Sequence, residues 1–399
     1  MSIPSGSRMR WASAVSTLAD AAPAVDEVVE ALRTGLAGAS VDLMLAFIGA
    51  AHVRHAEAMA AELRQKLSPG CLFGVTANGV VSREHELETG PALSVVAARL
   101  PGVRVRPFVL TQDLWRDALG DPKVFGAAAP GVGESELVLL TGDPFSLDVE
   151  RVLAAFHRHA RGVRVVGGMA SAAPRPHGNR IVLNDWVADE GGVGVALSGA
   201  LRVDVIVSQG CRPVGPPLTV TRAEGHLILE LDGQPALERA EQTLRSLGEG
   251  EREALRNGLY VGRPARLGAD GRGDWLIRNL LGADRDRGAL AVGDLIAERE
   301  RIRLHVRDRD AAREDLEMLL SPQAFDGQAG AALLFACNGR GRGLHGVPDG
   351  DLGLLQSALG GVPAAGMFCA GEIGPVGERN FLHGHTASIA IVREAATRS

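Results

Sequence analysis

A pattern of apolar and helical segments recurs three times along the chain of 399 residues. Each copy has an apolar segment of strand length, a helical segment, a second apolar segment that ends in glycine or small residues, a polar loop and a third apolar segment. The copies span 42–110, 136–210 and 330–392. A strand–helix–strand crossover makes two strands parallel, whereas a strand that returns through a turn lies antiparallel. The repeat therefore predicts layered, mixed sheets covered by helices, an α+β or mixed α/β fold.

Two details of the repeat give sharper expectations. The second copy predicts a helix over 146–160 with Ser146 as its N-cap. It also predicts that the strand over 201–210 pairs with the strand just before it, 192–199. No matching segment follows the third copy, so that copy is expected to lack this last strand.

A different region separates the second and third copies. Residues 217–233 predict a hairpin that turns at Glu224 and Gly225, and 234–247 predict a helix with Pro235 in its first turn. Further strands are predicted over 258–264, 274–284 and 289–308, and an amphipathic helix over 310–322. The turn at 211–217 is the expected boundary between two halves. The expected division is an N-terminal extension over 1–37, a first domain over 38–216 and a second domain over 217–394.

Composition excludes several classes of protein. The formal net charge of −6 argues against broad nucleic-acid binding, and 4% aromatic residues leave little for stacking bases. The longest apolar run, 43–51, is about half the roughly 20 residues that span a bilayer, and the start of the chain lacks the apolar core of a signal peptide. The four cysteines form no CxxC pair. We therefore expect a cytoplasmic protein with reduced thiols and no membrane contact.

Polar residues gather where the first strand of the third copy ends, in "ACNGRGRG". Cys337 and Asn338 end the strand, and glycines then alternate with Arg340 and Arg342. The loop lacks the GK[ST] ending of a phosphate-binding Walker loop and the GxGxxG spacing of a dinucleotide site. Arginine among backbone N–H groups suits a carboxylate or another small anion, although a solvated turn would have the same composition.

The second strand of the third copy ends in "CAGEIGPVGERN", which places Glu372 between Gly371 and Ile373. A buried glutamate needs a partner. Further along, His383 and His385 alternate, so they would share one face if both lay in a strand. Asn380 and Thr386 add an amide and a hydroxyl group.

Three functions are compatible with these residues, besides a purely structural role. His383, His385 and Glu372 could bind a metal ion. Cys337 and His383 could act as nucleophile and base in a hydrolase. Alternatively, Asn338, Arg340, Glu372 and His383 could bind a zwitterion or another small polar metabolite.

Several motifs resemble the FIST family of signal-transduction sensors. "LLFACNGRG", "GMFCAGEIGPV" and "NFLHGHTASIAIV" are similar to its C-terminal signature, and "LFGVTANGVV", "ALSVVAARLPGVRVRPF" and "VVGGMAS" to its N-terminal domain. The resemblance implies that the chain binds a small ligand such as an amino acid. The positions that match the family pattern are Asn338, Gly339, Arg340, Gly371, Glu372, Gly374, Pro375, His383, Gly384 and Thr386.

The resemblance implies a stand-alone sensor with a FIST N and a FIST C domain and no F-box, which binds a small ligand and signals to a separate protein. The ligand-binding residues it implies, with one loop glycine added, are Asn338, Gly339, Arg340, Gly341, Gly371, Glu372, His383 and Thr386. No metal, cofactor or catalytic residue is expected; a hydrolase that uses Cys337 and His383, or a His/Glu metal site, is the alternative. We expect Arg340 to meet a carboxylate of the ligand and Glu372 its ammonium group, with loops 337–343, 371–375 and 380–386 lining one cleft.

Overall fold

The computed structural model describes residues 8–265 and 275–395, which fall into two compact units. The first, called the sheet unit here, contains the described residues up to Val207, Glu317–Leu382 and those from Ala387 onward. The second, called the barrel unit, contains Ser208–Leu316 together with the short segment His383–Thr386.

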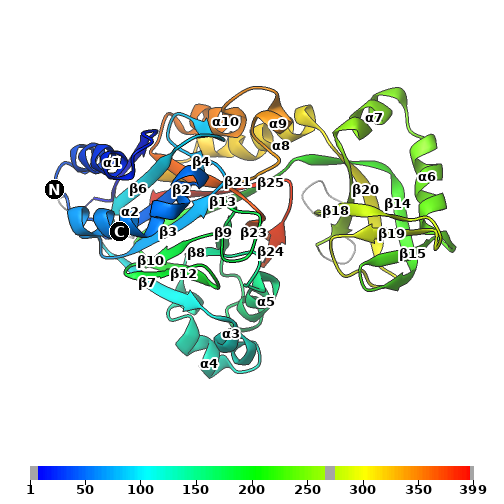
Figure 1. Cartoon of the computed structure of the whole chain (residues 1–399), viewed down its shortest axis with the longest axis horizontal. Coiled ribbons are helices and arrows are strands. Elements are labelled where there is room, and N and C mark those ends of the chain that lie inside the picture. Colours follow the sequence, from blue (N-terminus) through cyan, green and yellow to red (C-terminus); the bar gives the residue numbers. More distant parts are fainter. Residues whose placement is uncertain (1–7, 266–274, 396–399) are drawn as a thin grey trace. The chain divides into compact units, whose positions relative to one another are not determined.

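The sheet unit consists of three repeats, as the sequence predicts (Figure 1). The first repeat contains β1 (Arg10–Ser16), α1 (Ala21–Leu36), β2 (Leu43–Gly49), α2 (Ala56–Leu67), β3 (Leu72–Ala77), β4 (Val80–Val81), β5 (Glu86–Leu87) and β6 (Leu93–Arg99). The second contains β7 (Val103–Leu110), α3 (Gln112–Ala118), α4 (Pro122–Ala128), β8 (Leu137–Gly142), α5 (Val149–His159), β9 (Val165–Met169), β10 (Ile181–Leu183), β11 (Trp186–Ala188) and β12 (Gly192–Gly199). The third contains β13 (Leu201–Gln209), α8 (Arg309–Leu320), β21 (Ala331–Cys337), α9 (Arg342–His345), α10 (Gly350–Leu359), β22 (Ala364–Cys369), β23 (Glu372–Val376), β24 (Arg379–His383) and β25 (Thr386–Glu394).

The three repeats build sheets with the same strand order. Across the described residues these sheets run β1-β6-β2-β3-β10-β11, then β7-β12-β8-β9-β23-β24, and then β13-β25-β21-β22-β4-β5. In each sheet the two strands of the crossover are parallel, and a third strand lies antiparallel to the first of them. The predicted mixed sheets and the α+β class are thereby confirmed.

The outer strand of each sheet precedes its repeat instead of following it. β12 pairs with β7 over eight residues, from Gly192 opposite Leu110 to Gly199 opposite Val103, and β13 belongs to the third sheet. The prediction that 201–210 pairs with 192–199 is therefore wrong. Periodicity identifies an apolar strand but not its partner, and the repeat begins one strand earlier than predicted. The third repeat needs no later strand because β13 is already its outer strand.

Each repeat also contributes a hairpin to a neighbouring repeat. The hairpin β4–β5 pairs with β22 of the third repeat, β10–β11 with β3 of the first, and β23–β24 with β9 of the second. Every sheet is therefore completed by another repeat, so the three repeats are interlocked.

The inner faces of the three sheets share one apolar core. It combines side chains from all three repeats, among them Phe47, Leu139 and Phe335, and the rings of Phe47 and Phe335 meet edge to face with centroids 5.9 Å apart. Helices cover the outer faces: α1 and α2 cover the first sheet, and α3, α4 and α5 cover the second. This layering leaves the ends of the strands as the places where polar residues can gather.

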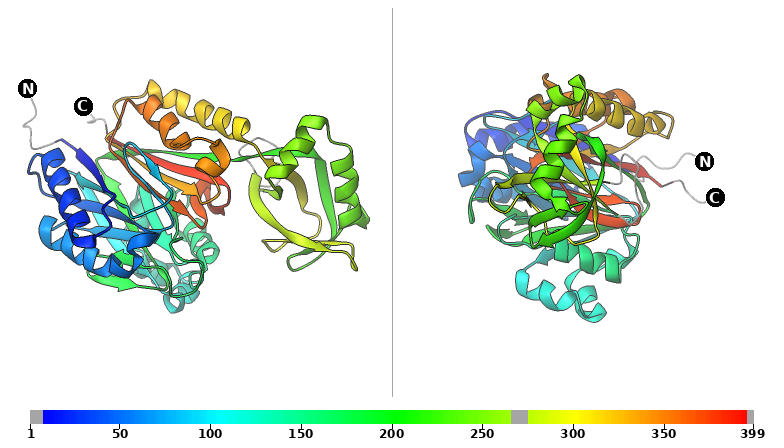
Figure 2. Two further views of the ribbon diagram at one scale, coloured as in Figure 1. Left: turned by 45° about the horizontal axis from the view of Figure 1, so that its top comes forward. Right: turned by 90° about the vertical axis from the view of Figure 1, so that its right-hand side faces the viewer.

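The barrel unit is an antiparallel barrel. Its elements are β14 (Cys211–Glu224), β15 (Leu227–Leu231), β16 (Gln234–Pro235), α6 (Ala236–Arg245), α7 (Glu249–Ala254), β17 (Leu259–Pro264), β18 (Trp275–Asp284), β19 (Ala289–Val292) and β20 (Arg301–Arg307). The strand order is β14-β20-β17-β18-β19-β15-β16, and β14 also pairs with β15, which closes the barrel (Figure 2). Ala236 and Ala240 of α6 pack into its apolar core.

The predicted hairpin over 217–233 and the helix over 310–322 are confirmed, whereas three local predictions are wrong. Segment 289–308 forms two strands, β19 and β20, instead of one. Pro235 is the N-cap of α6 and precedes its first turn. The N-cap of α5 is Asp148, whose carboxylate accepts the N–H of Arg151; Ser146 instead donates its hydroxyl to Asp143. The first residue of the predicted strand 274–284 lies outside the described residues.

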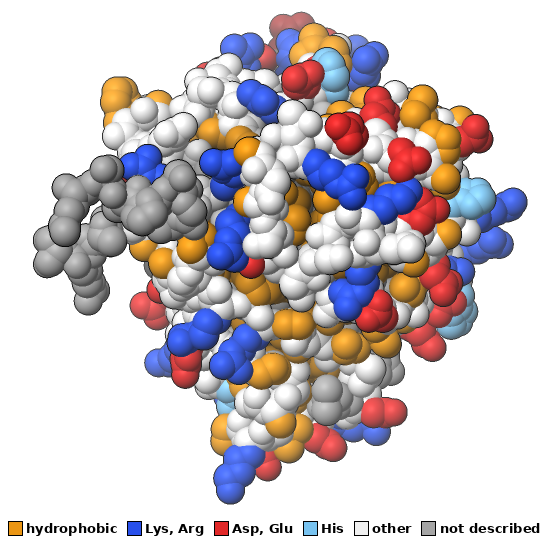
Figure 3. All heavy atoms as spheres, turned by 90° about the vertical axis from the view of Figure 1, so that its left-hand side faces the viewer, with side chains coloured by type: hydrophobic (Ala, Val, Ile, Leu, Met, Phe, Trp, Pro, Cys, Tyr) orange, Lys and Arg blue, Asp and Glu red, His pale blue; other side chains and the backbone are white. Residues whose placement is uncertain are grey.

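The described helices include none that is both long and apolar enough to cross a membrane. On the face drawn in Figure 3, basic and acidic side chains are interspersed and hydrophobic side chains lie between them.

Candidate functional site

The ends of β3, β9 and β22 meet within the sheet unit. Met169 donates its N–H to the carbonyl of Gly371 (2.8 Å), and Ser171 donates its N–H to Thr76 (3.3 Å). The hydroxyl of Ser171 also donates to the carbonyl of Phe368 (2.5 Å). These bonds tie the second strands of all three repeats together at one place, which is where "CAGEIG" lies.

Hydrogen-bond register shows which residue of each repeat is equivalent to Glu372. In every hairpin that crosses between repeats, one residue pairs with a strand glycine: Val81 with Gly366, Val182 with Gly74 and Ile373 with Gly167. The residues just before Val81, Val182 and Ile373 therefore occupy equivalent positions. They are Val80, Ile181 and Glu372.

Glu372 thus occupies a position that is apolar in the other two repeats. Val80 and Ile181 both belong to the central core. Glu372 is also 0% exposed, and its register partner Gly168 lies against Cys369, another residue of that core. A Cβ on Gly168 would lie 2.2 Å from the sulfur of Cys369. The third repeat therefore has a carboxylate at a position where the first two repeats have an aliphatic side chain.

Two cysteines lie beside this carboxylate. Cys337 and Cys369 are paired at the ends of the parallel strands β21 and β22. Cys369 is fully buried; burial raises the pKa of its thiol well above the ordinary value, and the negative charge of Glu372 raises it further. Cys337 is half-buried, and its sulfur accepts the N–H of Gly339 at 3.5 Å. The site therefore contains two thiols in different surroundings.

Arg340 is buried and bound to a carboxylate that the sequence analysis missed. Its Nε and Nη2 donate to Asp351 at 2.7 and 2.6 Å, and His345 Nε2 lies 3.0 Å from the same carboxylate. Burial acts to raise the pKa of Asp351, but the charge of Arg340 outweighs it and holds that pKa well below the usual range. Cys337 and Glu372 also interact electrostatically with the Arg340 guanidinium. Arg340 is thus a fixed positive charge next to Cys337 and Glu372.

Asp351 lies at the start of α10, where the hairpin of the first repeat docks. Glu86 of β5 accepts the N–H groups of Asp351 (3.1 Å) and Leu352 (2.8 Å), and donates its own N–H to Asp349 (2.6 Å). Burial first and the charge of Asp351 second raise the pKa of Glu86 to about 7. The arginine loop is therefore held by two repeats.

The remaining glycine-loop residues lie close to Arg340. Asn338 is exposed, and its backbone N–H donates to Cys369 at 3.0 Å. Gly341 has a φ of +57°, and a Cβ there would lie 2.6 Å from the carboxyl carbon of Glu88. Side chains are therefore excluded at Gly341 both by backbone strain and by contact.

His383 and Thr386 are both buried, at the end of β24 and at the start of β25. His383 is the last residue of β24, but His385 lies in the turn after it with a φ of +63°. The expectation that both histidines share one face of a strand is therefore wrong. The His385 ring packs on Tyr260 with centroids 4.2 Å apart, and its Nε2 lies 3.0 Å from Asn279 Oδ1.

Asn380 has a structural role: its amide bridges the backbone of Val163 and Val165 at 2.8 and 2.9 Å.

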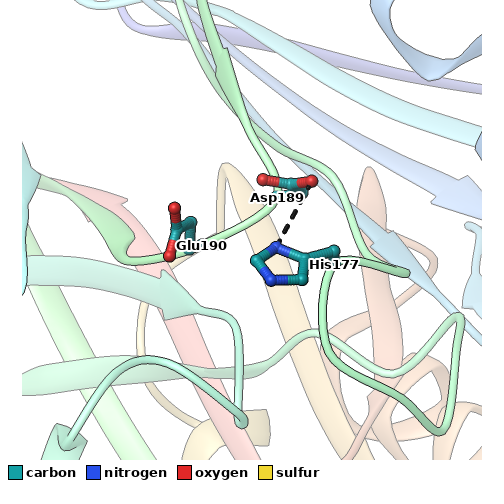
Figure 4. A group of neighbouring side chains, drawn as sticks. All are labelled: His177, Asp189 and Glu190. Atoms are coloured by element: carbon teal, nitrogen blue, oxygen red, sulfur yellow. Dashed lines mark ion pairs between the residues drawn. The ribbon is translucent and has the colours of Figure 1, made fainter.

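A separate polar group lies on the surface of the sheet unit. His177, Asp189 and Glu190 bring potential metal ligands together, and His177 Nδ1 lies 3.6 Å from Asp189 Oδ2 (Figure 4). Arg180 lies 3.9 Å from the same oxygen, so its positive charge opposes a bound cation. The sequence analysis did not single out this group, because its residues come from two separate loops.

The comparisons with known proteins agree with the motifs. Residues 42–234 match the FIST N domain and residues 236–375 the FIST C domain. An uncharacterised protein of Mycobacterium tuberculosis (strain H37Rv) is 38% identical over 389 residues, which cover 96% of this chain and 99% of the relative. An uncharacterised protein of Mycobacterium bovis is 37% identical over 387 residues, which cover 96% of this chain and 98% of that relative.

One solved structure covers the whole chain at low similarity. A cyanuric acid hydrolase from A. caulinodans aligns with 98% of this chain and 100% of its own, with a TM-score of 0.34 and 10% sequence identity. A similarity this low carries no argument about fold or activity.

Proposed function

Because this chain belongs to the FIST family, we propose that it is a sensor that binds a small polar ligand at Glu372 in the sheet unit. The observation that supports this site is the buried carboxylate at a position where equivalent repeats have Val80 and Ile181. Moving an ionised carboxylate out of water costs several kcal/mol, which valine and isoleucine avoid. Because the other two repeats fold with an aliphatic side chain at this position, we infer that the carboxylate serves ligand binding.

The proposed ligand is an amino acid or a similar small metabolite with an ammonium group. Glu372 accepts hydrogen bonds from the ammonium group of the ligand. The exposed amide of Asn338 and the backbone of Gly339 and Gly341 bind the other polar group of the ligand. The positive charge of Arg340 attracts the ligand, but its Nε and Nη2 do not donate to the ligand, since both donate to Asp351. A separate signalling protein then responds to the liganded state.

A thermal-shift screen of the purified protein tests the ligand class. The twenty common amino acids and their deaminated and decarboxylated analogues are added one at a time. A specific binder at a hundredfold excess over its Kd stabilises the folded protein by about 2.7 kcal/mol. We expect stabilisation by at least one amine-containing compound and none by its deaminated analogue. Equal stabilisation by the deaminated analogue would contradict the role of Glu372.

A further inference from the structure

Two of the four cysteines occupy paired positions on neighbouring strands. Cys337 of β21 is opposite Cys369 of β22 in the parallel register. Neighbouring strands lie about 4.8 Å apart. Disulfide-linked residues have Cα atoms roughly 4.4–6.8 Å apart. The register therefore places these two thiols within the range that a disulfide spans.

The repeat itself does not require these thiols. The equivalent pair in the first repeat is Gly49 opposite Ala77, three residues beyond the pair Ala46 and Gly74. In the third repeat, Cys337 and Cys369 lie three residues beyond Leu334 and Gly366. Small residues without sulfur thus complete the same fold elsewhere in the chain.

The surroundings of the two thiols distinguish Cys337 as the more reactive one. Cys337 is half-buried, receives the N–H of Gly339 and interacts electrostatically with the Arg340 guanidinium. A neighbouring cation and a donated N–H favour the nucleophilic thiolate. Cys369 is fully buried, and its raised pKa keeps it protonated.

We propose that Cys337 and Cys369 form a hydroperoxide-responsive thiol pair. The Cys337 thiolate attacks the distal oxygen of a hydroperoxide, the O–O bond breaks, and the leaving oxygen takes a proton to give water or an alcohol. Cys337 is then a sulfenic acid. The sulfur of Cys369 attacks the Cys337 sulfur, and the thiol proton leaves with the sulfenic hydroxyl as water, which completes the disulfide. Two thiols are oxidised and one hydroperoxide is reduced.

Closure of this bond would link the ends of β21 and β22 covalently beside Glu372. The reaction goes beyond the proposed ligand binding and requires no ligand. Its test is therefore carried out without ligand, and its result leaves the ligand proposal untouched.

The experiment treats the full-length reduced protein with hydrogen peroxide and maps the cysteines by peptide mass spectrometry without reduction. We expect loss of two of the four thiols and a peptide cross-link between Cys337 and Cys369. Cys71 and Cys211 serve as internal controls and should stay reduced, since both are buried. A protein that keeps all its thiols, or that oxidises Cys337 only to sulfinic acid, would overturn the proposal.

Two variants assign the order of the steps. Cys369→Ala should accumulate sulfenic acid at Cys337, trapped as its dimedone adduct, and Cys337→Ala should leave Cys369 reduced. Cys369→Ser serves as a second variant in case the alanine variant folds poorly. Oxidation of Cys369 by peroxide in the Cys337→Ala variant would contradict the assignment of Cys337 as the reactive thiol.

Discussion

At the scale of single residues, Arg340 and Glu372 have different roles despite their proximity. Arg340 and Asp351 form a buried pair with exposures of 1% and 0%. Removing one partner of such a pair leaves an uncompensated charge and costs about 3–5 kcal/mol. We therefore expect Arg340→Ala to lower the free energy of unfolding by about that amount, measured by urea denaturation.

The matched control for Arg340 is the exposed Arg342, two residues further along. Arg342→Ala should change the free energy of unfolding by less than about 0.5 kcal/mol, as surface substitutions usually do. Equal effects of the two substitutions would refute the structural role of the Arg340–Asp351 pair.

Glu86 gives a prediction about pH. The pKa of Glu86 is raised to about 7 by burial and by Asp351. The folded protein therefore binds this proton more tightly than the unfolded chain, where the pKa of glutamate is about 4.3. The contribution of Glu86 to stability is full below about pH 4.3 and is lost as the pH rises to about 7.

The Glu86→Gln variant keeps the side-chain oxygen that accepts the N–H groups of Asp351 and Leu352. Relative to wild type, it should gain about 2–3 kcal/mol in unfolding free energy between pH 5 and pH 8. His305, whose pKa burial lowers to about 4, titrates with the opposite sign in both proteins and cancels in this difference. The exposed Glu84→Gln is the control, and a Glu86→Gln profile parallel to wild type would argue against the raised pKa.

The sequence indicated Glu372 and Arg340 but not their partners. A glutamate between Gly371 and Ile373, just after an apolar strand, is unusual, so Glu372 was recognisable. Asp351 resembles an ordinary acidic residue in the first turn of a helix. Its contact with Arg340 depends on how loop 338–349 folds back, which sequence spacing does not reveal.

At the scale of secondary-structure elements, glycine sets how closely β21 and β22 approach. A Cβ on Gly366 would lie 1.8 Å from the carbonyl oxygen of Leu334. We expect Gly366→Ala to destabilise the protein by about 3 kcal/mol or more, because backbone must move to relieve the contact. Differential scanning fluorimetry would measure the change.

Gly353 in α10 is the matched control, because nothing lies within 4 Å of a Cβ placed there. Gly353→Ala should stabilise the protein by about 0.5–1 kcal/mol, since alanine favours a helix. Destabilisation of similar size by both substitutions would contradict the close approach at Gly366.

The helices and strands were predictable because the spacing of apolar residues and the glycines that interrupt it are local signals in the sequence. The pairing of strands leaves no such local signal. The strands β2, β8 and β21 follow from continuous apolar runs. The exchange of β4–β5, β10–β11 and β23–β24 between repeats depends on contacts between distant residues. The first of these hairpins has strands of only two residues, too short for a periodic signal.

At the scale of the whole chain, the two units should differ in their ability to fold alone. The fragment 1–207 lacks β21–β25 and therefore leaves its share of the central core exposed. We expect it to aggregate or to unfold without cooperativity. The fragment 208–316 retains every strand that closes the barrel and should be monomeric with a cooperative urea transition. Gel filtration and urea denaturation compare them; a stable, monomeric 1–207 would contradict the interlocked repeats.

The central claim is that Glu372 binds a ligand. The direct test is isothermal titration of wild type, Glu372→Leu and Glu372→Gln with the amine compound that stabilises wild type. Arg340 keeps Asp351 as its partner in both variants, so we expect both variants to fold, and urea denaturation measures the stability that each loses. The account predicts that both variants fold and lose at least about tenfold in affinity, or 1.4 kcal/mol. A folded Glu372→Leu protein that binds the compound as tightly as wild type would contradict it.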